Sequence, residues 1–374
     1  MTIDRLGFYQ VGEQKIYHKP MALMAHSKTG QPISWVFNDE VFGAIDWSIP
    51  VEDSLDELYR QRAQQLRDHY DHLTLYFSGG ADSSNMLRAF VTNNIFLDEI
   101  VMQSPSPVKR TFNDRDRSSR NVYSEIPYSA VPILDELKNL IDSRTVIRYQ
   151  DTSVGIIELL KNDNWYEYNP PGVALGINPL ARQYTALTEK HILKLSDQGK
   201  KIAQIVGVDK PLLHFDGQYY YAFFLDGNAL HCPPVELNIR ERFETSLHTE
   251  FFYWTPDLPR LVIKQAQEIK RACELDPRLR QIICVENNSA GQLRSVLHPI
   301  IYPSMPEVPF QADKDGQGTV RAKDLWFRYS AGKLQQNNFD SYMKFLESAI
   351  EPRFFMNHSI ANGFTLHNSR LYPL

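Results

Sequence analysis

One stretch limits the fold of this chain more than any other. In LTLYFSGGADSSNML, residues 73–87, a mostly apolar run ends in Ser-Gly-Gly, and a second run with several apolar residues follows at once. Residues 73–77 are short enough for a buried strand, and residues 82–92 have the apolar spacing of a helix. A strand that passes into a helix through a corner of two glycines predicts an α/β fold around a parallel sheet.

The same alternation continues to about residue 209. The predicted strands are 98–104, 144–150 and 201–209, and the predicted helices are 130–141, 154–162 and 180–198. Gly199 is the expected C-cap of the last of these helices. This order predicts one α/β domain over residues 73–211.

The N-terminal region has a different pattern. Residues 1–50 alternate apolar and polar side chains between turn signals, which predicts a small antiparallel sheet. Ser54 and Glu57 have the spacing of a capping box at the start of a helix over 54–70. We therefore expect a β-rich region with one helix over residues 1–72.

Beyond residue 211 the regular alternation stops. Residues 217–227 look like part of a hairpin, and residues 339–350 look helical. A longer helix is predicted over 257–275, with Asp257 as its cap and Pro259 in its first turn. We expect a mixed, mainly helical C-terminal region over 212–374, whose last residues, HNSRLYPL, fold back onto the sheet.

Composition limits the compartment and the partners. The chain has 374 residues, a net charge of −5 and a sequence pI of about 6.1, so it has no general electrostatic attraction to nucleic acid. Its three cysteines, Cys232, Cys273 and Cys284, form no CxxC pair and indicate neither a zinc site nor a disulfide framework. We expect a cytoplasmic protein without a signal peptide. No membrane partner is expected, because no apolar run approaches the ~20 residues of a membrane helix.

The glycine corner predicts an anion site. Glycines let main-chain N–H groups crowd around a ligand, and a helix N-terminus adds unpaired donors and partial positive charge. Ser78, Ser83 and Ser84 add hydroxyl donors for phosphate oxygens. Asp82 would repel a phosphate, so its expected role is to hold Mg²⁺, which bridges to the phosphates. An ordinary strand-to-helix turn with a Gly-Gly corner is the alternative.

The stretch SGGADSS is not a Walker A loop, because no lysine lies between Leu73 and Lys109, and it is not GxGxxG. It resembles the PP-loop, SGGxDS, of the N-type ATP pyrophosphatases, a family that includes the synthetase domain of asparagine synthetase. Every fixed position matches, namely Ser78, Gly79, Gly80, Asp82 and Ser83.

The resemblance implies a fold of the adenine-nucleotide α-hydrolase type, with a Rossmann-like parallel sheet. It also implies a reaction. Such enzymes cleave ATP between its α and β phosphates and adenylate a carboxylate or carbonyl oxygen, and an amine or ammonia then displaces AMP. ATP and Mg²⁺ would be the cofactors. By the same resemblance the loop, with Ser84, holds the pyrophosphate part of ATP, and Val101 and Met102 pass near the adenine.

A second stretch, IVGVDKP, ends the fourth predicted strand. Asparagine-synthetase-like enzymes carry roughly GxGxDE there, which implies a nucleotide contact at Gly207 and a metal-binding, catalytic role for Asp209. Lys210 replaces the final acid of that pattern and can instead neutralise phosphate charge. A β-turn after a strand is the alternative interpretation.

The same group of enzymes uses a lysine late in the chain to stabilise charge on the α-phosphate. Lys264 is our candidate for that catalytic role, with Lys270 as a second choice. A solvated lysine on the outside of a helix is the alternative for both.

The nucleophile and the biological role stay open. Thr2, rather than a cysteine, follows Met1, and about 70 residues are too few for a glutaminase domain before the loop. We therefore expect free ammonia, an amino group on the substrate, or a separate glutaminase as the nitrogen source. FFYWTPDLPRLVIKQAQEIK resembles asparagine-synthase-like proteins of bacteria and viruses that lack the glutaminase domain. A tRNA-modifying PP-loop enzyme and a non-catalytic nucleotide-binding or assembly protein are the alternatives.

Overall fold

The computed structural model describes residues 3–17, 19–104, 125–153, 189–207, 210–226, 245–286, 290–310 and 368–374. The helices predicted at 154–162 and 339–350 lie outside these ranges, as do Asp209 and Cys232. Within them, no helix combines the length and the apolar character that crossing a membrane requires.

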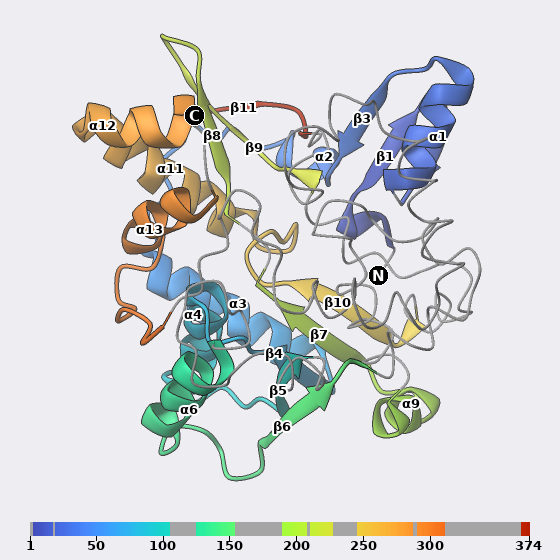
Figure 1. Cartoon of the computed structure of the whole chain (residues 1–374), viewed down its shortest axis with the longest axis vertical. Coiled ribbons are helices and arrows are strands. Elements are labelled where there is room, and N and C mark those ends of the chain that lie inside the picture. The colour runs from blue at the N-terminus through green and yellow to red at the C-terminus, as the bar shows by residue number, and fades with distance from the viewer. Residues whose placement is uncertain are drawn as a thin grey trace.

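Five parallel strands form the central sheet (Figure 1). In chain order they are β4 (His72–Tyr76), β5 (Glu99–Ser104), β6 (Val146–Asp151), β7 (Ile202–Val206) and β10 (Leu247–Phe251). Their order across the sheet is β10-β7-β4-β5-β6. The predicted α/β fold is thus confirmed, and the strand order is compatible with a Rossmann-like sheet.

Strand β10 was not predicted, although all of its residues are buried. It contains His248, Thr249 and Glu250, which hide the apolar pattern that a buried parallel strand normally shows. Glu250 is satisfied by a 2.6 Å ion pair with Arg62 and by the hydroxyl of Tyr70. The sheet therefore continues past residue 211, where we had placed the end of the α/β domain.

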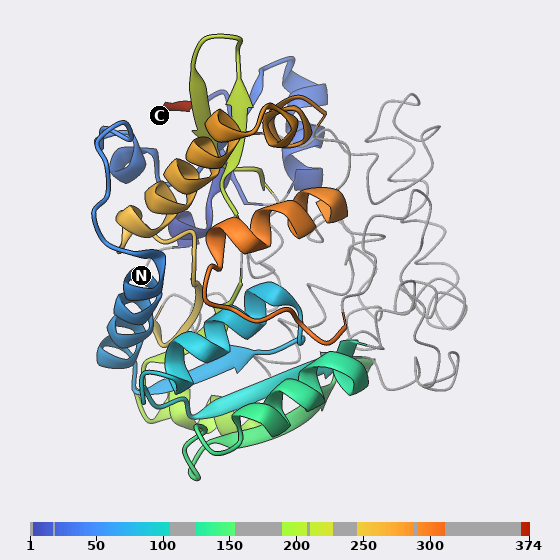
Figure 2. The ribbon, with the colours of Figure 1, turned by 90° about the vertical axis from the view of Figure 1, so that its left-hand side faces the viewer.

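Helices α3 (Leu55–His69), α4 (Ala81–Val91) and α6 (Val131–Leu137) pack on the sheet, and Figure 2 shows α4 and α6 side by side along one face. Helix α11 (Pro259–Leu275) packs against α3 and against α13 (Ala290–Ile301). The other described helical elements are η1 (Ile3–Leu6), α1 (Lys19–Thr29), α2 (Asp39–Phe42), η3 (Ile126–Ala130), α9 (Lys190–Asp197), α12 (Pro277–Arg280) and η7 (Gln281–Glu286).

The N-terminal region contains the predicted antiparallel sheet, formed by β1 (Phe8–Val11), β2 (Gln14–Ile16) and β3 (Ile33–Val36). The sequence reading missed helix α1, which packs on this sheet. The apolar residues of α1 do not gather on one helix face, so their spacing gave no helical signal.

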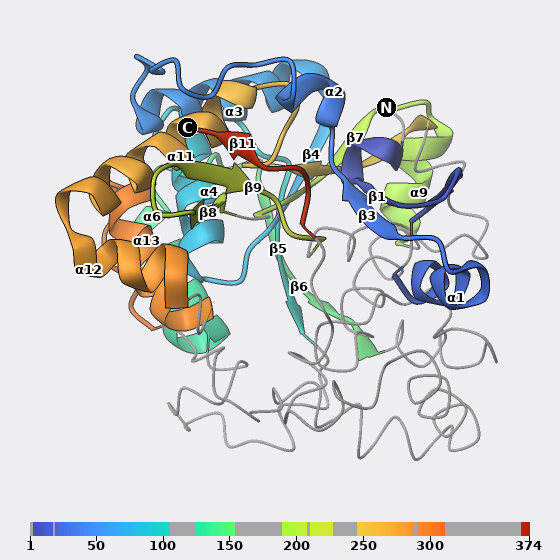
Figure 3. The same cartoon turned by 90° about the horizontal axis from the view of Figure 1, so that it is seen from above.

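A second small sheet lies nearer the C-terminus. The predicted hairpin is formed by β8 (Leu212–Phe215) and β9 (Tyr220–Phe223), and β11 (Tyr372–Pro373) adds to β9. The last residues therefore do fold back, but onto this hairpin and not onto the central sheet, as Figure 3 shows.

A cluster of aromatic rings joins these parts. Trp47 stacks on Tyr372 at 4.7 Å between ring centroids, and Phe224 contacts both of them as well as Trp254. Offset and edge-on aromatic contacts of this kind add to the burial of their large apolar surfaces. The cluster fixes the N-terminal region and the hairpin against the residues that follow β10.

Two predicted helix starts can be checked directly. Ser54 Oγ accepts a hydrogen bond from the main-chain N–H of Glu57 at 3.2 Å, which confirms this part of the predicted capping box. The predicted Asp257 cap is wrong: α11 begins at Pro259, Leu258 occupies the cap position, and Asp257 pairs with Arg5.

Candidate functional site

The candidate site lies where the strand order of the central sheet reverses. From β4 the chain moves to β5 and β6 on one side, and then to β7 and β10 on the other. Open parallel sheets bind ligands at the carboxyl ends of the two strands that flank this switch point. The loop of residues 78–83 follows β4, and Gly207 follows β7, so both predicted motifs reach this place.

Gly79 gives the loop its sharp bend. Its φ of +80° is in the left-handed region, and a Cβ atom there would lie 2.4 Å from the main-chain nitrogen of Ala130. Ser129 Oγ donates a hydrogen bond to the carbonyl of Gly79 at 2.6 Å. The loop is therefore pressed against η3 so closely that only glycine fits.

The loop leaves main-chain donors at the start of α4. Gly80 is the N-cap, and no side chain caps the helix. Ser83 Oγ instead donates to the carbonyl of Gly80 at 3.0 Å, and it lies 3.2 Å from the hydroxyl of Ser78. An uncapped helix start next to two hydroxyl groups can bind an anion.

Asp82, in the first turn of α4, is the centre of a polar cluster. Lys210 Nζ lies 2.6 Å from its Oδ1, and Tyr302 donates its hydroxyl hydrogen to the same oxygen at 2.7 Å. His298 Nε2 is 3.7 Å from that oxygen. The side chain of Lys210 is only 4% exposed, whereas that of Asp82 is 28% exposed, so the ammonium lies behind the carboxylate.

Two tyrosine hydroxyl groups donate hydrogen bonds to Asp82, in the first turn of α4. Tyr253 donates its hydroxyl hydrogen to the carbonyl of Asp82 at 2.8 Å and accepts a hydrogen bond from Asn85 at 3.1 Å. Burial, with the charge of Asp82 adding to it, raises the pKa of Tyr253 and of Tyr302 well above the ordinary value. Both hydroxyls therefore stay protonated and act as donors.

Gly207 brings the end of β7 against α4. A Cβ atom at this position would lie 3.3 Å from Cβ of Asp82 and 3.1 Å from Cε of Met86. The two glycine-bearing motifs, which are far apart in the sequence, thus meet at Asp82. Asp209, the predicted second metal ligand, lies outside the described residues.

Other predicted site residues are not brought into the cluster. Lys264 Nζ donates to the carbonyl of Val51 at 2.8 Å and pairs with Glu268 at 3.1 Å, so its described contacts are all away from the loop. Lys270 pairs with Glu274 along α11. Neither lysine has a described contact with the loop.

Three further residues that we expected to contact ATP are buried. Val101 is fully buried and Met102 is 9% exposed, so Val101 offers no surface to an adenine in this arrangement. Ser84 is 1% exposed, and its hydroxyl has no hydrogen-bond partner within the described ranges. Its burial in α4 separates it from the exposed Ser78.

The sequence reading missed Tyr253, His298 and Tyr302. Tyr253 follows β10 closely, so a correct prediction of that strand would have placed it near the carboxyl edge of the sheet. His298 is in the last turn of α13 and Tyr302 directly follows this helix, and no local pattern marks them. Their rings stack at 5.6 Å between centroids, which fixes both beside Asp82.

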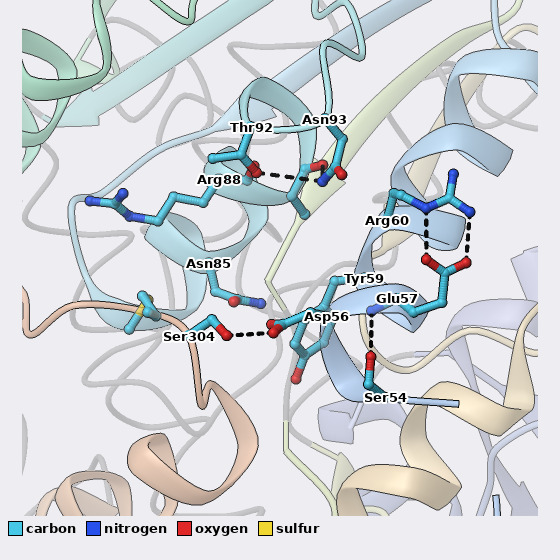
Figure 4. A pocket seen from close by; sticks show the side chains of 12 residues that line it. Ser54, Asp56, Glu57, Tyr59, Arg60, Asn85, Arg88, Thr92, Asn93 and Ser304 are labelled. Atoms are coloured by element: carbon cyan, nitrogen blue, oxygen red, sulfur yellow. Dashed lines mark hydrogen bonds and ion pairs between the residues drawn. The ribbon is translucent and has the colours of Figure 1, made fainter. Parts of the chain in front are cut away.

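A separate hollow of about 480 Å³ lies between α3, α4 and Ser304 (Figure 4). Most of its charged groups are paired: Glu57 holds Arg60, and Arg88 is held by Glu136 outside the hollow. Asn85 lines it and also donates to Tyr253. The hollow therefore adjoins the Asp82 cluster without containing its charged groups.

No known family model matches the chain, and no curated protein matches it.

Proposed function

We propose that the chain is an ATP-dependent synthetase that adenylates a carboxylate or carbonyl oxygen and then forms an amide or amidine with an amine or ammonia. The observation that carries this proposal is the position of residues 78–83. They begin an uncapped helix at the switch point of a parallel sheet. The match of this loop to the PP-loop supports the same reaction.

The main chain would supply the phosphate site. The N–H groups at the start of α4, with the hydroxyls of Ser78 and Ser83, would bind the pyrophosphate part of ATP. Gly79 keeps the loop close to η3, so that the donors are fixed before the ligand arrives. Donors fixed in advance stabilise developing charge without reorganisation.

The proposed reaction has two steps. In the first, a substrate oxygen attacks the α-phosphorus of ATP, the bond to the bridging oxygen of the β-phosphate breaks, and pyrophosphate leaves with that electron pair. In the second, an amine attacks the activated carbon, the carbon–oxygen bond to AMP breaks, and the amine loses a proton. Lys210 would offset the negative charge that accumulates on pyrophosphate.

Mg²⁺, which the PP-loop resemblance also implies, does not fit on Oδ1 of Asp82 in this arrangement. That oxygen already has Lys210 at 2.6 Å and the Tyr302 hydroxyl at 2.7 Å. Within the described ranges, no group of three His, Cys, Asp or Glu side chains could hold a metal ion. The proposed reaction therefore includes no step at a metal bound to Asp82.

The identity of the nucleotide products tests this proposal. The protein is incubated with ATP, Mg²⁺, a panel of carboxylic acids and an amine or ammonium donor, and the nucleotide products are separated. AMP and pyrophosphate that form only with a particular acid would support the synthetase. ADP and phosphate would contradict it, because they show cleavage at a different bond.

A second candidate is a non-catalytic nucleotide-binding or assembly protein. The observation that favours it is that Asp82 is engaged by Lys210 and Tyr302, while Ser83 is bonded to its own loop. Binding of ATP without turnover over a broad substrate panel would select this candidate over the synthetase.

A further inference from the structure

We propose that Lys210 is a built-in counter-ion of Asp82 that excludes a divalent metal ion from this carboxylate, so that nucleotide binding does not need a metal bound there. The inference deepens the proposed function and rests on it for the nucleotide. The exclusion of the metal by Lys210 can be tested on the protein alone.

The contacts of Asp82 Oδ1 oppose a metal ion at this oxygen. Lys210 Nζ and the hydroxyl of Tyr302 both contact Oδ1 of Asp82, at 2.6 and 2.7 Å. A Mg²⁺ ion binds a carboxylate oxygen at about 2.1 Å and demands nearly octahedral geometry. An ion on Oδ1 would lie against the ammonium group, and the two positive charges would repel each other. Metal binding at this oxygen therefore requires Lys210 to leave.

The burial of Lys210 favours keeping its ammonium group beside Asp82. The side chain of Lys210 is 4% exposed, and water cannot solvate its ammonium group in this position. A buried charge is costly unless an opposite charge accompanies it, so the loss of Asp82 as a partner has a cost that another anion can offset. A nucleotide phosphate at the start of α4 is such an anion, whereas an incoming divalent cation is not.

The residues on either side of Lys210 limit where it can lie. Gly207 lets the end of β7 contact Asp82, with Cβ positions 3.3 Å apart, and Pro211 and β8 follow Lys210 directly. The lysine is thus fixed between two strands whose positions are set by the sheets. It stands where the resembling pattern, GxGxDE, has an acid, so a negative group is replaced by a positive one beside Asp82.

The test on the free protein measures Mn²⁺ binding, with Mn²⁺ as a paramagnetic stand-in for Mg²⁺. Unbound Mn²⁺ is followed by electron paramagnetic resonance for wild type, Lys210→Met and Lys210→Glu. We expect Lys210→Glu to bind Mn²⁺ about tenfold or more tightly than wild type, and Lys210→Met to fall between them. The gain should vanish when Asp82→Asn is added. Equal Mn²⁺ binding by wild type and both variants would overturn the proposal.

The matched control is Lys264→Met. Lys264 is a partly buried lysine that pairs with Glu268 and has no described contact with Asp82. Its substitution should leave Mn²⁺ binding unchanged. Thermal unfolding of every variant shows whether it is folded, and Lys210→Arg keeps the positive charge if Lys210→Met does not fold. An Mn²⁺ gain in Lys210→Arg or in Lys264→Met would contradict an origin in the Lys210 charge.

The test with nucleotide uses calorimetry with α,β-methylene-ATP, with Mg²⁺ or with EDTA. We expect wild type to lose less than about tenfold in affinity in EDTA, and Lys210→Met to lose about tenfold or more. Abolition of wild-type binding by EDTA would overturn the metal-independent part of the inference. If wild type binds no nucleotide under either condition, the proposed function and the nucleotide part of the inference both fail, and the Mn²⁺ measurement alone decides whether Lys210 excludes metal.

Discussion

The hydroxyl of Tyr302, directly after α13, donates a hydrogen bond to Oδ1 of Asp82 at 2.7 Å, although 220 positions separate the two residues. Their contact fixes the C-terminal end of α13 to the first turn of α4. Because Tyr302 is 2% exposed, its hydroxyl has little access to water as an alternative partner. The geometry of the candidate site therefore depends on tertiary packing as much as on the loop itself.

Tyr302→Phe removes this hydrogen bond and keeps the ring. We expect the free energy of unfolding in urea to fall by about 1 kcal/mol, because Asp82 keeps its ion pair with Lys210. The matched control is Tyr219→Phe, since the Tyr219 hydroxyl accepts from Gln218 at the surface. Equal effects of the two substitutions would show that the Tyr302 bond contributes nothing specific.

Gly79→Ala tests the close approach of the loop to η3. We expect a loss of about 3 kcal/mol or more in the free energy of unfolding, from the positive φ and from the contact of the new Cβ with Ala130. Gly217→Ala is the control, because Gly217 has a φ of +104° but no atom within 4 Å of the added Cβ. It should cost about 1–2 kcal/mol. Similar losses at both positions would mean that the packing against Ala130 is not tight.

Asp82→Asn tests the pair with Lys210. We expect a loss of about 2 kcal/mol in the free energy of unfolding, less than for a fully buried pair because Asp82 is 28% exposed. The double variant with Lys210→Met should recover most of this stability, because no ammonium is then buried beside a neutral amide. Synthetase turnover should be lost in both variants. If stability fell further in the double variant, the two side chains would not act as a pair.

The lowered pKa of Glu99 predicts how the free energy of unfolding depends on pH. Burial alone would raise the pKa of Glu99, but the nearby His72, at 3.7 Å, and hydrogen bonds from Arg148 outweigh it and lower the pKa from 4.5 to about 2. A carboxyl group with a lowered pKa stabilises the fold above its unfolded pKa and loses this contribution as the pH falls through the folded value. The loss should therefore occur between about pH 4.5 and pH 2, and should amount to roughly 3 kcal/mol at most.

Urea unfolding of Glu99→Gln over this pH range measures that contribution. The variant should be less stable than wild type at pH 5, and the difference should shrink as the pH approaches 2. Glu136→Gln, which removes an exposed pair with Arg88, is the control and should change little at any pH. A pH-independent difference between Glu99→Gln and wild type would rule out this assignment.

The sequence was sufficient to predict the elements that carry a local signal. The strand before residue 78 and the helix after it follow from apolar spacing and from two glycines, and β5, β6 and β7 follow from the same alternation. The place of the loop at the carboxyl edge of the sheet could also be expected, because parallel strands bring their carboxyl ends to one edge, whereas the switch point follows from the observed strand order. The assignment of ATP to that loop is still a prediction.

What the sequence could not predict depends on contacts between distant segments. Strand β10 lacks the apolar pattern of a buried strand, because it contains polar residues such as Glu250. The partner of Glu250, Arg62, lies on another element. Lys210 had two possible roles in the sequence, and only the fold pairs it with Asp82. The role proposed for Lys264 depended on a resemblance with no local motif, and its described contacts are with Val51 and Glu268.

A crystal structure with α,β-methylene-ATP would show whether the loop of residues 78–83 binds the phosphates of a nucleotide. The proposed phosphate site predicts phosphate oxygens within hydrogen-bonding distance, about 3 Å, of main-chain nitrogens at the start of α4. It also predicts that Lys210 Nζ keeps its ion pair with Asp82 in the complex. A nucleotide bound away from the carboxyl ends of β4 and β7 would contradict the account.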